Sequence, residues 1–235
     1  MPSITDAILT ATPDPTRPML TFYDDKTGER TELSALTLGN WAAKTANYFR
    51  DELGVAPDDT IIVDLPEHWQ TVAILLGAWW AGATVAFAGE AAEDARVVVT
   101  SLARLDDYAD AEELVIASLD PFGMGAGDLP VGVADFGPSV RVHSDNFTPG
   151  TDAAAALRDR SPSSVLEDAR GAADAAGIGR GDRVLTTRTW NDAETVVANL
   201  IGPLTVGAGL VVVAHPDEER IAARAQTERA TTTLR

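Results

Sequence analysis

Short apolar runs alternate with segments of helical periodicity along most of this sequence, and this alternation constrains the fold more than any other feature. In the first half, apolar runs at 60–65 and 84–88 enclose a segment in which Trp69, Leu76 and Trp80 recur at helical spacing. Continuous apolar runs of this length are typical of strands buried on both faces of a parallel sheet. The order strand, helix, strand predicts parallel strands joined by a right-handed crossover.

The second half has the same order. Apolar runs at 183–187 and 210–214 enclose a helical segment that opens with capping-box spacing, Asn191-x-x-Glu194. The turns before the first strand of each half are also similar, Gly54-Val-Ala-Pro-Asp-Asp and Gly177-Ile-Gly-Arg-Gly-Asp. Two interpretations stay open: a genuine structural repeat, or the likeness of any two α/β units. Under either one we predict an α/β fold of two similar α/β subdomains, with largely parallel sheets flanked by helices.

Two further regions surround this regular pattern. Residues 19–33 are typical of a β-hairpin, and an amphipathic helix capped by Ser34 is predicted over 35–53. Residues 119–160 contain many prolines and glycines and have no helical period. We predict loops there, with short strands at 131–136 and 140–144.

An irregular connection of this length is typical of a domain boundary or of a functional loop. We therefore predict a first subdomain over residues 1–140, which includes the N-terminal hairpin, and a second over residues 141–235. This division places the irregular stretch at the end of the first subdomain.

Composition excludes several functions. The formal net charge is −18, and no basic stripe is present, so we expect no nucleic-acid partner and no anionic membrane surface as a partner. Absence of cysteine excludes disulfides and thiolate chemistry. The longest apolar stretch, 72–88, is too short and broken to span a membrane, and no signal sequence is recognised, so a cytoplasmic protein is expected.

Few residues present a pattern that carries chemistry. His68, His143 and His215 are scattered and lack metal-ligand spacing, so caps or surface positions are expected for them. The glycine cluster 123–127 lacks the lysine and the following helix of a phosphate loop. We therefore predict no catalytic residue, no cofactor site and no metal site from the residue patterns.

Three stretches of the first half resemble the start of the adenylate-forming enzymes, the superfamily of acyl-CoA synthetases, adenylation domains and luciferases. They are residues 31–47, the turn at 54–59, and the segments 65–70 and 77–83. Residues 177–185, 193–204 and 206–213 resemble the region that follows this superfamily's phosphate loop. The sequence also resembles short homologues of actinobacterial type that carry no assigned activity. The resemblance implies the N-terminal part of the superfamily's fold.

Departures from the superfamily's pattern decide the expected function. Its phosphate loop should fall between the two halves, but residues 140–153 do not contain that motif. Its catalytic lysine has no counterpart, because only Lys26 and Lys44 occur. We expect a shortened homologue without adenylation activity, with a binding or regulatory role. The alternatives are a small acyl or nucleotide ligand-binding protein and an assembly subunit, a homo-oligomer formed through surface that the shortening exposes.

One element of the superfamily's site has a counterpart here. The aromatic element that lines the acyl pocket corresponds to residues 188–192, so the resemblance implies ligand contacts from Trp190, Asn191 and Asp192. The alternative is that these residues only begin a capped helix. A small acyl ligand is therefore the expected partner.

Overall fold

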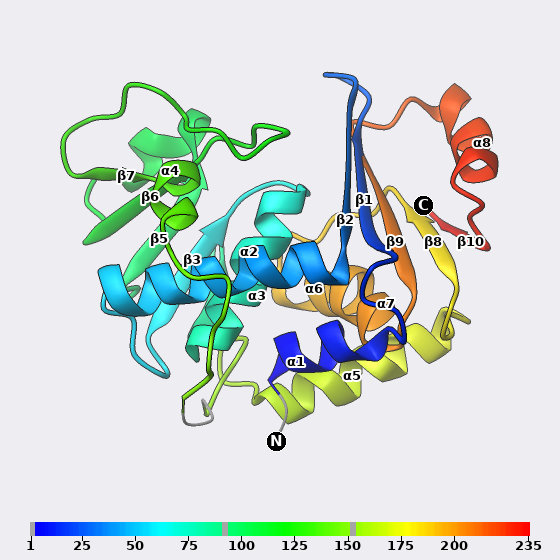
Figure 1. Ribbon diagram of the computed structural model, residues 1–235, viewed down its shortest axis with the longest axis horizontal. Helices are drawn as coiled ribbons and strands as arrows, with labels where there is room; N and C mark the ends of the chain where they lie inside the picture. The colour runs from blue at the N-terminus through cyan, green and yellow to red at the C-terminus, as the bar shows by residue number, and fades with distance from the viewer. Residues whose placement is uncertain (1–2, 91–93, 151–153) are drawn as a thin grey trace.

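The computed structural model describes residues 3–90, 94–150 and 154–235, and these form two five-stranded sheets (Figure 1). The first sheet has the order β10 (Thr232–Leu234), β8 (Arg183–Thr186), β9 (Gly209–Ala214), β1 (Pro18–Asp24), β2 (Glu29–Ser34). The second has the order β4 (Thr84–Phe87), β3 (Thr60–Asp64), β5 (Val97–Ser101), β6 (Glu113–Ala117), β7 (Val133–Asp135). Apart from the antiparallel β1–β2 pair, the neighbouring strands are parallel. The predicted α/β class is confirmed.

The helical elements complete the layers. They are α1 (Ile4–Ala11), α2 (Ala35–Asn47), the π-helical turn η1 (Tyr48–Glu52), α3 (Trp69–Ala81), the 3₁₀ segment η2 (Leu102–Tyr108), α4 (Phe136–Arg141), α5 (Pro162–Ala175), α6 (Ala193–Val196), the π-helical turn η3 (Val197–Ile201), α7 (Gly202–Thr205) and α8 (Glu218–Thr227). Most of the long helices lie between the two sheets (Figure 1), and one continuous apolar core joins them to both sheets. On the outer faces, α8 covers the first sheet and η2 covers the second. Within the described residues, no helix is long and apolar enough to cross a membrane.

Helix α3 is the central helix of the molecule and is buried almost all round. At Gly77 it approaches α2 so closely that an added Cβ would lie 2.5 Å from Cβ of Thr45. The helix begins at Trp69, with His68 as the N-cap. The side chain of His68 accepts a hydrogen bond from the backbone of Gln70, which satisfies a free N–H of the first turn.

The strand predicted at 140–144 is wrong, because the chain forms helix α4 up to Arg141 and then a turn. Phe136 and Val140 lie four residues apart and are both fully buried, so they share one helix face toward the core. A strand would place Val140 and Val142 on the same face, but Val142 is 81% exposed. The strand predicted at 131–136 is confirmed as the shorter β7.

The N-cap of α6 is Asp192, whose carboxylate accepts from the backbone N–H of Thr195, and not Asn191 as the spacing indicated. Helix α1 was not predicted. It begins with a capping box formed by Ser3 and Asp6.

The hairpin β1–β2 lies in the sheet of the second half. Strand β1 pairs in parallel with β9, with Leu20 opposite Leu210, so the first sheet combines the beginning and the end of the described chain. The sequence had assigned the hairpin to the subdomain 1–140 together with β3 and β4, which form the other sheet. The division of the chain at residue 140 stays a prediction.

Candidate functional site: the junction of the loops after β3 and β8

Two loops from different sheets meet beyond the carboxyl ends of their strands. The first follows β3 and covers residues 65–68, and the second follows β8 and covers residues 187–192. The backbone N–H of Trp190 donates to Oε1 of Glu67 over 2.9 Å and joins the two loops. Because ligands of open α/β sheets bind beyond the carboxyl ends of the strands, we take this junction as the candidate site.

The second loop is hydrogen-bonded to the π-helical turn η3. Asn199 is buried in that turn, and its Nδ2 donates to the carbonyl oxygen of Thr189 over 2.7 Å. A π-helical turn widens the helix locally and often occurs at functional sites. Here it places an amide side chain directly behind the loop that carries Trp190.

The three residues that the resemblance implied lie in three different environments. Trp190 is 1% exposed, and its indole Nε1 is buried without a hydrogen-bond partner among the described residues. Asn191 is exposed to solvent. Asp192 caps α6, and the hydrogen bond from the backbone N–H of Thr195 lowers the pKa of its carboxyl group. The helix-start alternative thus describes Asp192, and the ligand role of all three residues stays a prediction.

His68 links the loop after β3 to the hairpin of the other sheet. Its Nδ1 accepts from the backbone N–H of Gln70, so a neutral ring carries its proton on Nε2. That Nε2 is buried and lies 3.5 Å from Oε1 of Glu29, beyond good hydrogen-bond distance. The ring also meets Phe22 edge-on, with 4.7 Å between the ring centres. His68 is thus the predicted cap and also a buried contact between the sheets.

The two residues that follow His68 add further unpaired polar atoms. Trp69 Nε1 and Gln70 Oε1 are both buried and have no hydrogen-bond partner within the described ranges. Gln70 uses its Nε2 to donate to the carbonyl oxygen of Asp120 over 2.9 Å. Consecutive side chains at the start of α3 therefore bury two donors, on His68 and Trp69, and one acceptor, on Gln70, without partners among the described residues.

The glycine-rich loop after β6 packs onto this region. Gly123 has a φ of +64°, and an added Cβ would lie 2.9 Å from Cη2 of Trp41 and 3.2 Å from Cη2 of Trp69. Several N–H groups of the loop are already hydrogen-bonded within the protein. Asp120 accepts from the backbone of Phe122 and Met124, and Asp135 accepts from another N–H of the loop.

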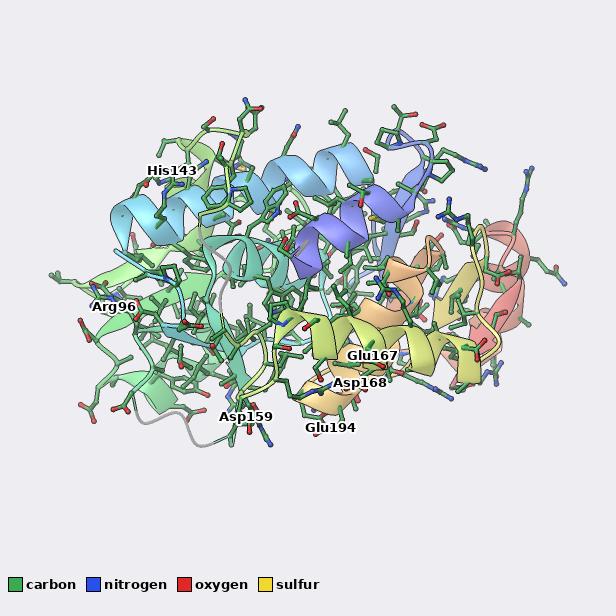
Figure 2. The ribbon with its side chains drawn as sticks, turned by 90° about the horizontal axis from the view of Figure 1, so that it is seen from below. Arg96, His143, Asp159, Glu167, Asp168 and Glu194 are labelled. Atoms are coloured by element: carbon green, nitrogen blue, oxygen red, sulfur yellow. The ribbon has the colours of Figure 1, made fainter. Side chains whose placement is uncertain are left out.

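The junction contains no lysine. Nζ of Lys44 donates to the carbonyl oxygen of His143 over 2.6 Å, and Lys26 lies in the exposed turn of the β1–β2 hairpin. His143 lies on the side of the molecule far from α5 (Figure 2). Across residues 3–90, 94–150 and 154–235, no group of three His, Asp or Glu side chains is arranged to hold a metal ion. The junction thus combines unpaired polar side-chain atoms with aromatic rings.

This arrangement of two mostly parallel sheets matches the fold of one half of the acyl-CoA synthetases. An acyl-CoA synthetase from Brucella canis superimposes with a TM-score of 0.80 at 20% identity, over 99% of this chain and 47% of that one. A benzoate CoA ligase from Burkholderia xenovorans LB400 gives 0.71 at 19% identity, over 99% and 50%. An acetoacetyl-CoA synthetase from Streptomyces lividans gives 0.74 at 18% identity, over 98% and 42%. The chain spans about half the length of these enzymes, and the fold that the resemblance implied is confirmed.

A closer relative is found by sequence. No family model matches the chain. A Mycobacterium tuberculosis protein (strain ATCC 25618 / H37Rv), described as a TIGR03089 family protein, is 44% identical over 236 residues, which cover 99% of this chain and 96% of that protein. The chain therefore belongs to the TIGR03089 family.

Proposed function

We propose that this protein binds a small acyl ligand, a carboxylic acid or its thioester, at the junction of the loops after β3 and β8, and that the residues of this chain do not adenylate it. One observation carries the proposal. The start of α3 and the loop after β8 bury unpaired polar atoms on His68, Trp69, Gln70 and Trp190. Buried polar groups in folded proteins are nearly always hydrogen-bonded, so an unpaired set at the usual ligand position is a reason to expect a ligand.

The chemistry of the unpaired atoms favours an oxygen-rich ligand. Three of them are N–H donors when His68 is neutral, and they suit the two oxygens of a carboxylate or the carbonyl oxygen of a thioester. The aromatic rings of Trp69, Trp41 and Phe22 give the region an apolar wall. Sites of this kind, mostly apolar with a few convergent polar groups, are typical of small-molecule binding.

The proposed lack of adenylation rests on charge. Adenylation moves negative charge onto a phosphate, and enzymes stabilise such charge with fixed cations or oriented N–H donors. Lys44 donates to the carbonyl oxygen of His143, Lys26 lies in the exposed hairpin turn, and the glycine-rich loop has several of its N–H groups bonded to carboxylates. We therefore infer that the protein binds the acyl ligand in a regulatory role and does not activate it by adenylation.

Thermal-shift and calorimetric titrations test the binding. Short linear and aromatic carboxylic acids, their CoA thioesters, ATP and AMP form the panel. We expect an acid or thioester to stabilise the protein, and Trp190→Phe and Trp69→Phe, which remove the indole N–H and make the ring smaller, to weaken binding of that ligand about tenfold. Trp80→Phe is the matched control, because the indole of Trp80 lies on the same helix and donates to Asp6.

Two results would contradict the proposal. The first is the absence of any shift across the panel, and the second is an equal loss of binding in the Trp80 control. Adenylation is measured separately as ATP–pyrophosphate exchange with the acids that bind. Robust exchange by this chain would overturn the second half of the proposal and leave the binding site in place.

A further inference from the structure

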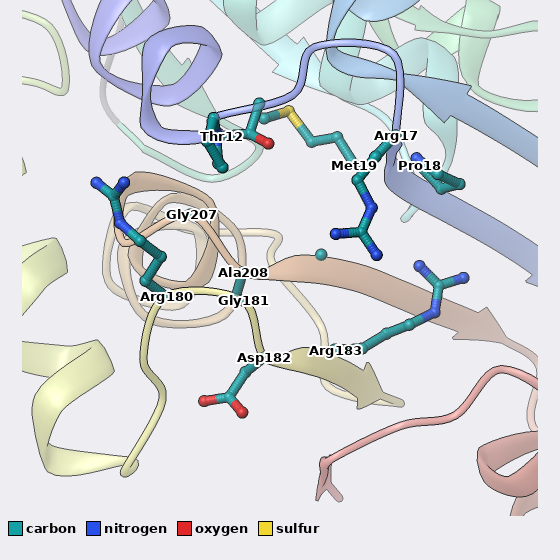
Figure 3. Close-up of a pocket in the computed structure, with 12 residues that line it drawn as sticks. Thr12, Arg17, Pro18, Met19, Arg180, Gly181, Asp182, Arg183, Gly207 and Ala208 are labelled. Carbon is teal, nitrogen blue, oxygen red and sulfur yellow. The ribbon is translucent and has the colours of Figure 1, made fainter.

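A cavity lies at the opposite end of the first sheet from the junction, at the amino ends of β1, β8 and β9 (Figure 3). Its volume is about 170 Å³. Glycines and small residues from the turns before β8 and β9 form part of its wall, and the segment before β1 forms another. The cavity is thus separate from the junction at the carboxyl ends of the strands.

Three arginines line this cavity in a protein whose net charge is −18. They are Arg17, from the segment before β1, and Arg180 and Arg183, from the turn and the start of β8. Arg17 and Arg180 form no ion pair with any residue in the described part of the chain. In Figure 3 the guanidinium groups of Arg17 and Arg183 lie on the same side of the cavity, and that of Arg180 lies on the other side.

Arg183 is held rigidly from its far side. Its Nε donates to the carbonyl oxygen of Glu228, and its Nη2 donates to the carboxylate of Glu228 and, over 3.0 Å, to Oγ1 of Thr21. These bonds leave Nη1 without a hydrogen-bond partner among the described residues, next to Gly209 at the cavity wall. A guanidinium fixed in this way offers its remaining donors without further loss of side-chain entropy.

The neighbouring carboxylates are already engaged elsewhere. Asp182 lines the cavity, but its oxygens accept from the backbone N–H of Gly179 over 2.7 Å and from Oγ1 of Thr231 over 2.8 Å. Its side chain points away from Arg17 and Arg183 (Figure 3). Asp14 precedes Arg17, and its Oδ1 accepts from the backbone and the hydroxyl of Thr16. Arg17 and Arg180 therefore bring positive charge without an ion-pair partner among the described residues, and Arg183 adds a free Nη1 beside its ion pair with Glu228. The one carboxylate in the cavity lining, that of Asp182, is turned away.

We propose that this cavity binds the phosphoryl group of a small phosphate compound. Guanidinium groups match the oxygens of a tetrahedral oxyanion through paired N–H donors, and donors from separate arginines suit an anion with three or more free oxygens better than a carboxylate with two. The volume accepts a phosphate with a small substituent. Because the chain as a whole carries a net charge of −18, we expect anion binding to be confined to this cavity.

Titration with inorganic phosphate by calorimetry or NMR, at an ionic strength matched with sodium chloride, tests the proposal. We expect saturable binding to the wild-type chain and about tenfold weaker binding to Arg17→Gln and to Arg180→Gln, because each variant removes one charge-assisted contact. Arg170→Gln is the matched control, since Arg170 is exposed on α5, away from the cavity. Trp190→Phe should bind phosphate as the wild type does.

Each other outcome would overturn the proposal. No saturation by phosphate would exclude the site, and equal weakening in the Arg170 control would show an effect of net charge alone. Acetate that competes as strongly as phosphate would indicate a carboxylate site. Glycerol phosphate and inorganic phosphate, compared in the same titration, distinguish a phosphate ester from the free ion as the ligand.

Discussion

Trp190 and Glu67 connect the two sheets through a single hydrogen bond, from the backbone N–H of Trp190 to a carboxylate oxygen of Glu67 over 2.9 Å. Glu67 belongs to the loop after β3 and Trp190 to the loop after β8, so the bond fixes the position of one loop against the other. The second connection nearby, between His68 and Glu29, is longer at 3.5 Å. The Trp190–Glu67 bond is therefore the better-defined contact across the junction.

Removal of this acceptor should destabilise the fold. We expect Glu67→Ala to lower the free energy of unfolding by about 1–2 kcal/mol, because it leaves the backbone N–H of Trp190 unpaired beside a buried ring. Glu67→Gln retains an oxygen acceptor and should cost less than half as much. Urea denaturation measures both. Glu167→Ala, at an exposed position of α5 (Figure 2), should change stability little, and a loss there equal to that of Glu67→Ala would contradict the prediction.

The turn at Gly123 should tolerate no side chain. Its φ of +64° disfavours other residues, and an alanine Cβ would press against the rings of Trp41 and Trp69. We expect Gly123→Ala to destabilise the protein by about 1–3 kcal/mol. Gly171→Ala, at an exposed position of α5 where the new Cβ would meet no other part of the protein within 4 Å, should instead stabilise it by about 0.5–1 kcal/mol. Opposite signs in thermal unfolding are the expected result, and equal signs would refute it.

Glu228 should make stability depend on pH in the acidic range. Burial raises the pKa of its carboxyl group, but hydrogen bonds from Tyr23, Arg183 and Arg30 outweigh burial and hold the pKa at about 2, against 4.5 for the free side chain. A carboxyl with a lowered pKa contributes stability above its unfolded pKa, and that contribution disappears as the pH falls through the folded pKa. The contribution of Glu228 should therefore be complete above pH 4.5 and largely lost near pH 2.

Glu228→Gln separates this contribution from that of the other carboxylates. Between pH 5.5 and pH 2 the wild-type chain should lose about 2–3 kcal/mol more unfolding free energy than the variant does. The exposed Glu167→Gln serves as the control and should follow the wild-type curve. Parallel curves for wild type and Glu228→Gln would show that the carboxylate is not stabilised in the folded state.

Asp192 should stabilise the fold through the hydrogen bond that it accepts as the N-cap of α6, and not through its charge alone. Asp192→Ala removes the acceptor for the N–H of Thr195 at the start of the helical segment α6–η3–α7, and we expect a loss of about 1 kcal/mol. Asp192→Asn keeps a capping oxygen and should stay within a few tenths of a kcal/mol of the wild type at neutral pH. Chemical denaturation compares the two, and equal losses would assign the effect to charge.

The local sequence pattern was sufficient to predict the strands and the helix that carry the junction. The apolar runs at β3, β4, β8 and β9 and the helical spacing from Trp69 to Trp80 predict these elements, because buried parallel strands and amphipathic helices leave continuous signals in the sequence. Helix α4 gave no such signal, since Gly137 and Pro138 in its first turn are typical of a loop. Its helical character depends on the burial of Phe136 and Val140 in tertiary contacts.

The candidate site was predictable only in part. Trp190 emerged from the resemblance to adenylate-forming enzymes, and His68 was expected as a cap. Glu67, Gln70 and Glu29 were not singled out, because their roles depend on contacts between segments far apart in the sequence. The same is true of the hairpin, whose partner strand β9 cannot be read from the residues near it.

The place of β1 in the first sheet has a consequence for biosynthesis. The hairpin is synthesised well before β9, so Leu20 can pair with Leu210 only after β9 has been synthesised. All strands of the second sheet, β3 to β7, are synthesised before β9. Until β9 is available, the edge of β1 that pairs with it has no neighbouring strand. Open apolar strand edges promote aggregation, and contacts between distant segments form slowly. A nascent chain that stalls before residue 209 therefore presents a finished half and an unprotected hairpin, which is the state that a chaperone would need to cover.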